Sequence, residues 1–155
     1  PYAAPRRYAA GLALSADRST LYFADAESSA IRKLTIGRDA RVTTLVGKGL
    51  FDFGEKNGPF AQARLQHPLG LAVSGDDVLV SDTYNSILRS LDLKTRSASD
   101  WGAEGFTCQD TLCRPLRQPA GITVDGPDRV LVVDTNNHRV EEYRPSTKTF
   151  HTWAR

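Results

Sequence analysis

Short apolar runs separated by polar turns recur three times along the chain. In each recurrence two such runs lead to an Asp: Gly11–Leu14 and Leu21–Asp25, Gly70–Val73 and Val78–Asp82, then Gly121–Val124 and Val130–Asp134. Further apolar residues follow each Asp at two fixed offsets, at Ile31, Leu88 and Val140 and at Leu34, Leu91 and Tyr143. Runs this short, rich in Val, Leu, Tyr and Phe and bounded by Gly, Asp, Asn or Ser, predict β-strands rather than helices.

Each recurring unit predicts four antiparallel strands. They fall near residues 11–15, 20–25, 31–36 and 41–46 in the first unit, 70–74, 78–82, 87–92 and 96–101 in the second, and 121–125, 130–134, 139–143 and 148–153 in the third. A four-stranded sheet repeated radially is a β-propeller blade. The sequence therefore predicts an all-β chain of three four-stranded blades, at about 8–46, 67–101 and 118–155, with insertions at 47–66 and 102–117.

The recurring residues Asp25, Asp82 and Asp134 are candidates for either a catalytic or a structural role. An Asp at the end of a strand can accept hydrogen bonds from backbone N–H groups two or three residues later and so fix the hairpin. A catalytic acid is needed once, whereas this Asp recurs in every unit. We therefore interpret all three as structural turn residues.

The residues around these runs resemble the NHL repeat. His67–Val73 and Gln118–Asp125 look like its opening, and Val133–Val140 is similar to its signature almost letter for letter. The first unit lacks the Asn-His pair of that signature, and the second has Tyr84 and Ser86 where the family often has Asn and His. The resemblance covers nearly the whole chain and implies an NHL-type ring of about six blades, of which three are half.

A narrower resemblance lies in the first insertion. Gly49–Gly58, followed by Ala63–Gly70, is similar to the propeller part of thioredoxin-like proteins that carry C-terminal NHL repeats. The sequence contains no Cys-x-x-Cys, so no redox activity is carried over to this chain.

An arc of three blades leaves one apolar face bare at each end. If each face resembles one side of a standard interface, it covers roughly 800 Å², more than the ~300–600 Å² of the largest apolar patch on typical monomers. We expect either that two chains pair head to tail about a two-fold axis into a closed six-bladed ring, or that the missing blades belong to the same native polypeptide.

The turn after the second strand of each blade and the connection into the next blade open on the same face. Loops on a rigid scaffold are where binding is usually built, so we expect this loop face to present itself to a protein or peptide partner. The candidate binding residues are Phe51, Phe53, Lys56, Arg64, Tyr84, Asn85, Asn136, Asn137, His138 and Arg139. In the first insertion Asn57-Gly58-Pro59 predicts a short helix through Gln66, with Ala63 and Leu65 filling the gap between blades.

RNA binding is one alternative function. Phe51, Phe53 and Phe60 lie near Lys48, Lys56 and Arg64 in the sequence, and aromatic and basic residues together can stack on and neutralise nucleic acid. The net charge is only +2, however, whereas nucleic-acid surfaces show a concentrated basic stripe. The sequence therefore disfavours nucleic acid as the partner.

A metal-dependent propeller hydrolase or lyase is the other alternative. Such enzymes hold the metal with polar residues around the central channel, but Asp125 is the only carboxylate on the predicted innermost strands. His67 and His138 fall at repeat positions, where packing and turn bonds explain them. Because no Ser–His–Asp arrangement, phosphate-binding glycine loop or metal-spaced cluster is visible in the sequence, we expect a non-catalytic recognition module that needs no cofactor and no metal.

The two cysteines, Cys108 and Cys113, leave the redox compartment open. A local disulfide between them is geometrically possible and would imply an oxidising compartment, but two reduced loop thiols fit the sequence equally well. No apolar run is long enough to cross a membrane and no basic-then-apolar leader is visible, which favours a cytoplasmic location. A chain that begins at Pro1 and contains no Met suggests a fragment or a processed product.

Overall fold

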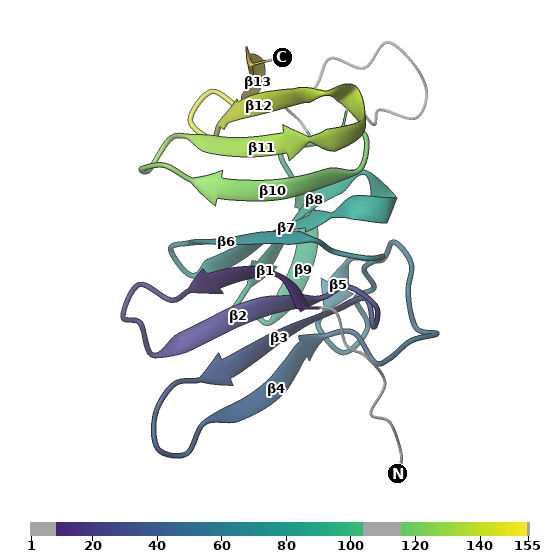
Figure 1. Cartoon of the computed structure of the whole chain (residues 1–155), viewed down its shortest axis with the longest axis vertical. Helices are drawn as coiled ribbons and strands as arrows, with labels where there is room; N and C mark the ends of the chain where they lie inside the picture. Colours follow the sequence, from purple (N-terminus) through teal and green to yellow (C-terminus); the bar gives the residue numbers. More distant parts are fainter. Residues whose placement is uncertain (1–8, 104–115, 155) are drawn as a thin grey trace.

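The computed structural model describes residues 9–103 and 116–154 as three antiparallel sheets stacked side by side (Figure 1). Blade 1 contains β1 (Ala9–Leu14), β2 (Thr20–Asp25), β3 (Ala30–Thr35) and β4 (Arg41–Val46). Blade 2 contains β6 (Gly70–Ser74), β7 (Asp77–Asp82), β8 (Ile87–Asp92) and β9 (Ser97–Trp101), with the short β5 (Gly58–Pro59) outside β9. Blade 3 contains β10 (Pro119–Val124), β11 (Val130–Asp134), β12 (Arg139–Arg144) and β13 (Thr149–Ala154).

Apart from β5, strands that follow one another in the sequence within a blade are hydrogen-bonded neighbours. The three predicted four-stranded units are therefore confirmed. A 3-10 turn follows the second strand of blade 2 (η1, Thr83–Asn85) and of blade 3 (η3, Thr135–Asn137). These single turns are far too short to cross a membrane, and no helix elsewhere in the described ranges is long and apolar enough to do so.

Two apolar cores lie between the blades. Blades 1 and 2 enclose a core of buried side chains from both sheets and from the first insertion: Tyr22, Ala24, Ile31, Leu45, Val46, Phe60, Ala63, Leu65, Leu71, Val78, Val80, Leu91 and Ala98. Blades 2 and 3 enclose Leu79, Leu88, Leu116, Val130, Val132 and Tyr143. Because blade 2 is covered on both faces, Val78, Leu79 and Val80 are all buried, which is why β7 reads as a continuous apolar run.

The first insertion does not form the predicted helix. Gly58 and Pro59 pair with Ala98 and Ser97 of β9 instead, and the N–H of Ala63 donates to the Pro59 carbonyl in a single turn. The free edge of β9 offers unpaired backbone groups that an extended segment can satisfy. The prediction that Ala63 and Leu65 fill the gap between blades is confirmed, since both are completely buried in the core between blades 1 and 2.

The innermost strands approach one another closely at glycines. A Cβ on Gly11 would come within 2.7 Å of the Leu69 carbonyl oxygen, and a Cβ on Gly70 would overlap the Ala120 carbonyl oxygen. Only glycine allows the next blade's backbone to come this near. Blades 1 and 2 therefore each present a glycine to the segment that enters the following blade.

The outward faces of the two end blades carry exposed apolar side chains. Leu12 of β1 is 62% exposed, whereas Leu71, at the equivalent position of β6, is 4% exposed. Leu14 and Val42 on blade 1 and Val133 on blade 3 are likewise exposed. This asymmetry is expected of an arc whose ends have no neighbouring blade.

Candidate functional site

Asp82 joins the turn of blade 2 to the connection that precedes it. It accepts hydrogen bonds from the Gln66 backbone N–H at 2.7 Å, Asn85 Nδ2 at 2.8 Å and Arg89 Nε at 3.1 Å. Its side chain is completely buried. Burial raises the pKa of Asp82 to about 6, against the opposing effects of the hydrogen bonds from Asn85 and Gln66 and of the Arg89 charge. Every one of these partners lies within the blade and its connection, as a structural residue requires.

The same arrangement recurs at Asp134 of blade 3. This carboxylate accepts from the Arg117 backbone N–H at 2.6 Å and from Asn137 Nδ2 at 2.7 Å. The predicted role of the recurring Asp thus fits the structure, but the predicted donors differ. In blades 2 and 3 a side-chain amide stands where a backbone N–H of the turn was expected, and the second donor comes from the connection, well outside the turn.

Asp25 of blade 1 comes nearer to the sequence prediction. Arg32 Nε donates to its Oδ2 at 2.8 Å. Burial raises the pKa of Asp25, but hydrogen bonds from the Ser28 side chain and backbone and from Arg32 outweigh it, so the pKa is lowered.

Blade 3 differs from the other two blades at one position on its third strand. Arg32 and Arg89 occupy equivalent places on β3 and β8, where β12 has Glu141. Arg139 lies between the two acids of blade 3, with Nε 2.8 Å from Asp134 Oδ2 and 2.8 Å from Glu141 Oε1. Arg139 was predicted as a binding residue, but its charge is engaged inside the blade.

Other predicted binding residues are also engaged within the fold. Asn85 is buried and donates to the Gly54 carbonyl as well as to Asp82. Arg64 forms an ion pair with Asp52, and Asn136 Nδ2 donates to Gln118 Oε1 at 2.8 Å. We therefore leave five of the predicted residues out of the candidate binding surface: Arg64, Asn85, Asn136, Asn137 and Arg139.

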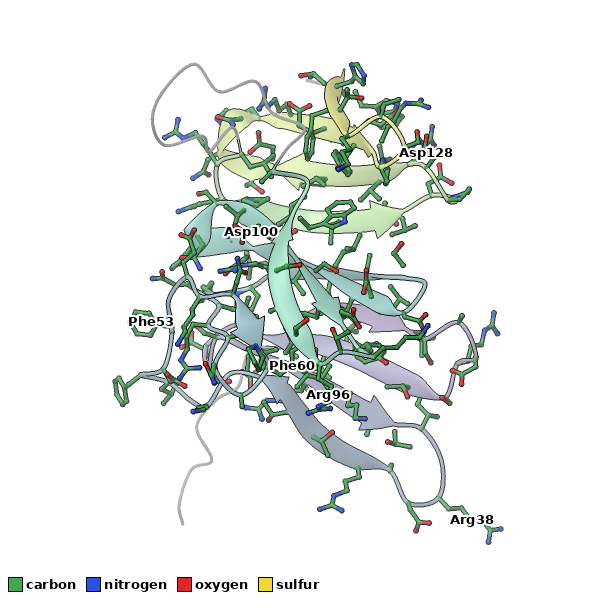
Figure 2. All side chains as sticks on the ribbon, turned by 180° about the vertical axis from the view of Figure 1, so that it is seen from behind. Arg38, Phe53, Phe60, Arg96, Asp100 and Asp128 are labelled. Atoms are coloured by element: carbon green, nitrogen blue, oxygen red, sulfur yellow. The ribbon has the colours of Figure 1, made fainter. Side chains whose placement is uncertain are left out.

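The loop face keeps a cluster of exposed aromatic side chains. The turns after the second strands and the first insertion lie on one side of the arc, on the right in Figure 1. Phe51 is 94% exposed, and Phe53 and Tyr84 are each 53% exposed. Figure 2 shows Phe53 pointing away from the ribbon. Lys56 is exposed on the same insertion.

A groove of about 220 Å³ lies on this face, between the turn of blade 1 and the first insertion. Its lining residues are Glu27, Ser29, Leu50, Phe53, Gln66, His67 and Tyr84. The His67 and Tyr84 rings are stacked, with centroids 4.4 Å apart and planes 17° apart. The His67 backbone is left-handed, with φ of 51°, and its N–H donates to Ser29 Oγ at 3.1 Å. Neighbouring polar groups therefore hold the aromatic wall of the groove in place.

Sequence reasoning found Phe53 and Tyr84 but missed the other residues of the groove. It assigned His67 to packing, because its repeat position explained it. Glu27, Ser29 and Leu50 come from blade 1 and the insertion, and only the stacking of blades brings them beside Tyr84. No local signal in the sequence marks them.

Potential metal ligands and the two cysteines were the other candidate sites in the sequence. The described residues contain no group of three or more His, Cys, Asp or Glu that could hold a metal ion. Cys108 and Cys113 lie outside the described residues, so their redox state stays a prediction. His138 is exposed at the turn of blade 3.

The comparisons with known proteins agree with the repeat pattern. The family model of the NHL repeat matches residues 116–143, which include the Asp134 turn. The chain is built from NHL repeats. This match, together with the relatives and solved propellers described next, confirms the resemblance inferred from the sequence and the propeller fold.

The curated relatives are much longer proteins. The chain is 33% identical over 82% of its length to Protein SUPPRESSOR OF QUENCHING 1, chloroplastic, of Arabidopsis thaliana, and spans 13% of that protein. It is 32% identical over 96% of its length to NHL repeat-containing protein 2 of Homo sapiens and spans 22% of it. The chain therefore spans less than a quarter of the length of either relative.

Solved propellers share the fold at low sequence identity. One is the crystal structure of a nidogen/laminin complex, which is similar to this chain with a TM-score of 0.70 and 17% sequence identity. The match covers 97% of this chain and 49% of the chain in that structure. Another is the structure of virginiamycin B lyase from Staphylococcus aureus, with a TM-score of 0.60 and 14% sequence identity. The match covers 99% of this chain and 44% of the lyase chain. At these identities the likeness shows the fold alone.

Proposed function

We propose that this NHL segment is a non-catalytic recognition module that binds an apolar side chain of a protein or peptide partner in the loop-face groove. The observation that carries the proposal is the pair of half-exposed aromatics, Phe53 and Tyr84, held around a preformed groove. Aromatic residues dominate the binding energy of protein interfaces, mainly where they are buried on binding.

The groove is built to keep its shape before a partner arrives. Tyr84 lies between the buried Thr83 and Asn85 of the 3-10 turn and stacks on His67. Its backbone N–H donates to the Gln66 carbonyl at 3.1 Å. A wall that is already ordered loses little conformational entropy on binding, which favours affinity.

The rim of the groove supplies polar groups to orient a peptide. Glu27 is exposed and lines the groove together with the aromatic residues, and the partly exposed Gln66 lines it as well. An apolar centre with a polar rim is the usual anatomy of a protein interface. The structure of a nidogen/laminin complex provides a precedent for a propeller of this shape in a protein–protein assembly.

RNA binding has less support from the structure than from the sequence. Arg64, one of the three cations near the phenylalanines, is paired with Asp52. Lys56 is exposed but has Glu55 beside it in the sequence. A continuous basic stripe is what backbone recognition of nucleic acid requires.

The proposal can be tested with a phage-displayed random peptide library panned on the chain. Enriched peptides should share an aromatic or aliphatic residue and should bind the Phe53→Ser and Tyr84→Ser variants at least about tenfold more weakly. Val42→Ser, on the far flank of blade 1 and similarly exposed at 51%, is the matched control and should bind normally. Equal binding to all three variants, or no enrichment, would contradict the proposal. Retention on RNA that weakens steeply with salt would favour the nucleic-acid alternative.

A further inference from the structure

Two leucines occupy the same place on successive blades. Leu65 is completely buried in the core between blades 1 and 2, and Leu116 is 2% exposed in the core between blades 2 and 3. Each begins a run of the pattern Leu-Xaa-Xaa-Pro-Xaa-Gly, at residues 65–70 and 116–121. The run forms the connection into the first strand of a blade, and its leucine packs against the blade before.

The backbone of this run is also held in the same way at both places. Two residues after each leucine, His67 and Gln118 adopt left-handed conformations, with φ of 51° and 48°. Their N–H groups donate to the hydroxyls of Ser29 at 3.1 Å and Ser86 at 3.3 Å, which belong to the turn of the preceding blade. One apolar side chain and one backbone hydrogen bond therefore attach each connection to the blade before it.

Blade 3 has the same socket, and no run of this kind from the described residues lies in it. A cavity of about 370 Å³ is lined by Val133, Thr135, His138, Arg139, Val140 and Ala154. Val140 pairs with Ala154 across the sheet, just as Ile31 pairs with Val46 in blade 1 and Leu88 with Trp101 in blade 2. His138 has the left-handed conformation of Ser29 and Ser86, with φ of 53°.

Gly121 supplies a second and independent observation. At the equivalent Gly11 and Gly70, the carbonyl of the next blade's connection leaves no room for a side chain. At Gly121 a Cβ would come near the Val133 side chain, at 3.2 Å, and among residues 9–103 and 116–154 it would meet no backbone atom of another blade. Its φ is not positive, so the turn geometry does not require glycine here. A glycine in this place is suited to a backbone that approaches from a following blade.

We infer that the socket on blade 3 binds a Leu-Xaa-Xaa-Pro-Xaa-Gly connection that leads into a further NHL blade. The leucine packs on Val133 and Val140, and the next carbonyls lie over Gly121. The residue two positions after the leucine places its N–H at the turn that contains His138, where Ser29 and Ser86 accept the bond in the other blades.

A second copy of this chain is a poorer occupant. Aligned on Gly11, the residue that corresponds to Leu65 and Leu116 is Arg6. An apolar socket would have to desolvate the guanidinium without offering it a carboxylate, which is costly. The occupant we assign is therefore a blade with an aliphatic residue at this position, as the much longer relatives have room to supply.

A peptide that copies residues 116–124 provides a direct probe of the socket. In methyl NMR spectra of the chain, this peptide should shift the signals of Val133 and Val140 in a saturable way. A peptide with Leu116→Arg should bind at least about tenfold more weakly. The chain variant Val133→Glu should lose the binding, whereas Val42→Glu, on the opposite flank, should keep it. Equal binding of both peptides, or shifts confined to other residues, would overturn the inference.

A longer chain tests the same contact even if the free peptide binds too weakly to be detected. A second copy of residues 116–154, attached after residue 155 by a flexible linker, should raise the urea midpoint of unfolding. Leu116→Arg in the attached copy should remove that gain. If neither the peptide binds nor the attached blade stabilises the chain, the inference is wrong. If the unmodified chain instead doubles its mass in sedimentation, and Val133→Glu abolishes the doubling, then a second copy is the occupant and the assignment to a further blade fails.

Discussion

Arg89 donates from Nε to Asp82 Oδ2 at 3.1 Å, and both side chains are almost completely buried in blade 2. The guanidinium also reaches Asp100 Oδ1 at 3.0 Å, at the edge of the sheet, where Figure 2 shows Asp100. A buried ion pair is often no more stabilising than a pair of apolar residues that replaces both partners. Removing only one partner, however, leaves the other charge buried and uncompensated, which is strongly destabilising. The pair therefore controls whether the connection, the turn and the sheet of blade 2 remain together.

Replacing Arg89 by Met should destabilise the chain by about 3–5 kcal/mol, because the Asp82 carboxylate would remain buried without its cation. The free energy of unfolding in urea measures the effect. Lys94→Ala is the matched control, since Lys94 forms an ion pair with Asp76 in which both side chains are largely exposed. This control should show no resolvable change. A similar small change for Arg89→Met would mean that the pair is not buried as described.

The pH dependence of the free energy of unfolding should reflect the raised pKa of Asp82. Its pKa is about 6 in the folded chain and about 3.9 when unfolded, so the folded chain binds the proton first as the pH falls. The contribution of Asp82 to the free energy of unfolding should therefore increase between pH 7 and pH 4. In urea unfolding, the wild-type chain should gain stability relative to Asp82→Asn over this interval. A loss of relative stability would contradict the raised pKa.

Asp25 should respond to acid with the opposite sign. Its folded pKa is lowered by Ser28 and Arg32 despite burial, so its contribution is present above the pKa of the unfolded chain and is lost as the pH falls below it. Carboxyl carbon NMR titrations should show Asp25 titrating below the usual range and Asp82 well above it. Two superimposable titration curves would refute this difference.

The sequence predicted the strands well because their signals are local. The short apolar runs of β2, β7 and β11 and the polar turns between strands depend on neighbours in the chain, and the structure has all of them. The prediction of a helix in the 57–66 segment was wrong for the opposite reason. Its helix-start residues Asn57-Gly58-Pro59 are real local signals, but the free edge of β9 and the core that takes Phe60 and Leu65 override them.

The groove was only partly predictable because its members come from different blades. Phe53 and Tyr84 could be placed on the loop face from the repeat. The stacking of Tyr84 on His67 depends on the left-handed backbone at His67 and its bond to Ser29, a contact between blades. The partners of Asp82 and Asp134 in the preceding connections are distant in sequence for the same reason.

Leu71 and Leu12 form a matched pair that tests whether the flank of blade 1 is bare. Leu71→Ala should cost about 2–5 kcal/mol, because it leaves a cavity in the core between blades 1 and 2. Leu12→Ala, at the equivalent place on the outward face, should cost much less, since Leu12 is 62% exposed. Urea unfolding of both variants gives the comparison. Equal costs would show that another blade or another molecule covers Leu12 in solution.

Gly70 and Gly121 should differ in their tolerance of a methyl group. Gly70→Ala forces a Cβ into the Ala120 carbonyl, so blades 2 and 3 must separate, and the cost should reach about 1–3 kcal/mol or more. Gly121→Ala meets only the flexible Val133 side chain, and in this chain it should be nearly neutral. When a further blade is attached after residue 155, Gly121→Ala should become as costly as Gly70→Ala. Urea midpoints of these three variants and of the two unmodified chains decide the matter, and a neutral Gly121→Ala in the extended chain would show that the added blade does not dock over this strand.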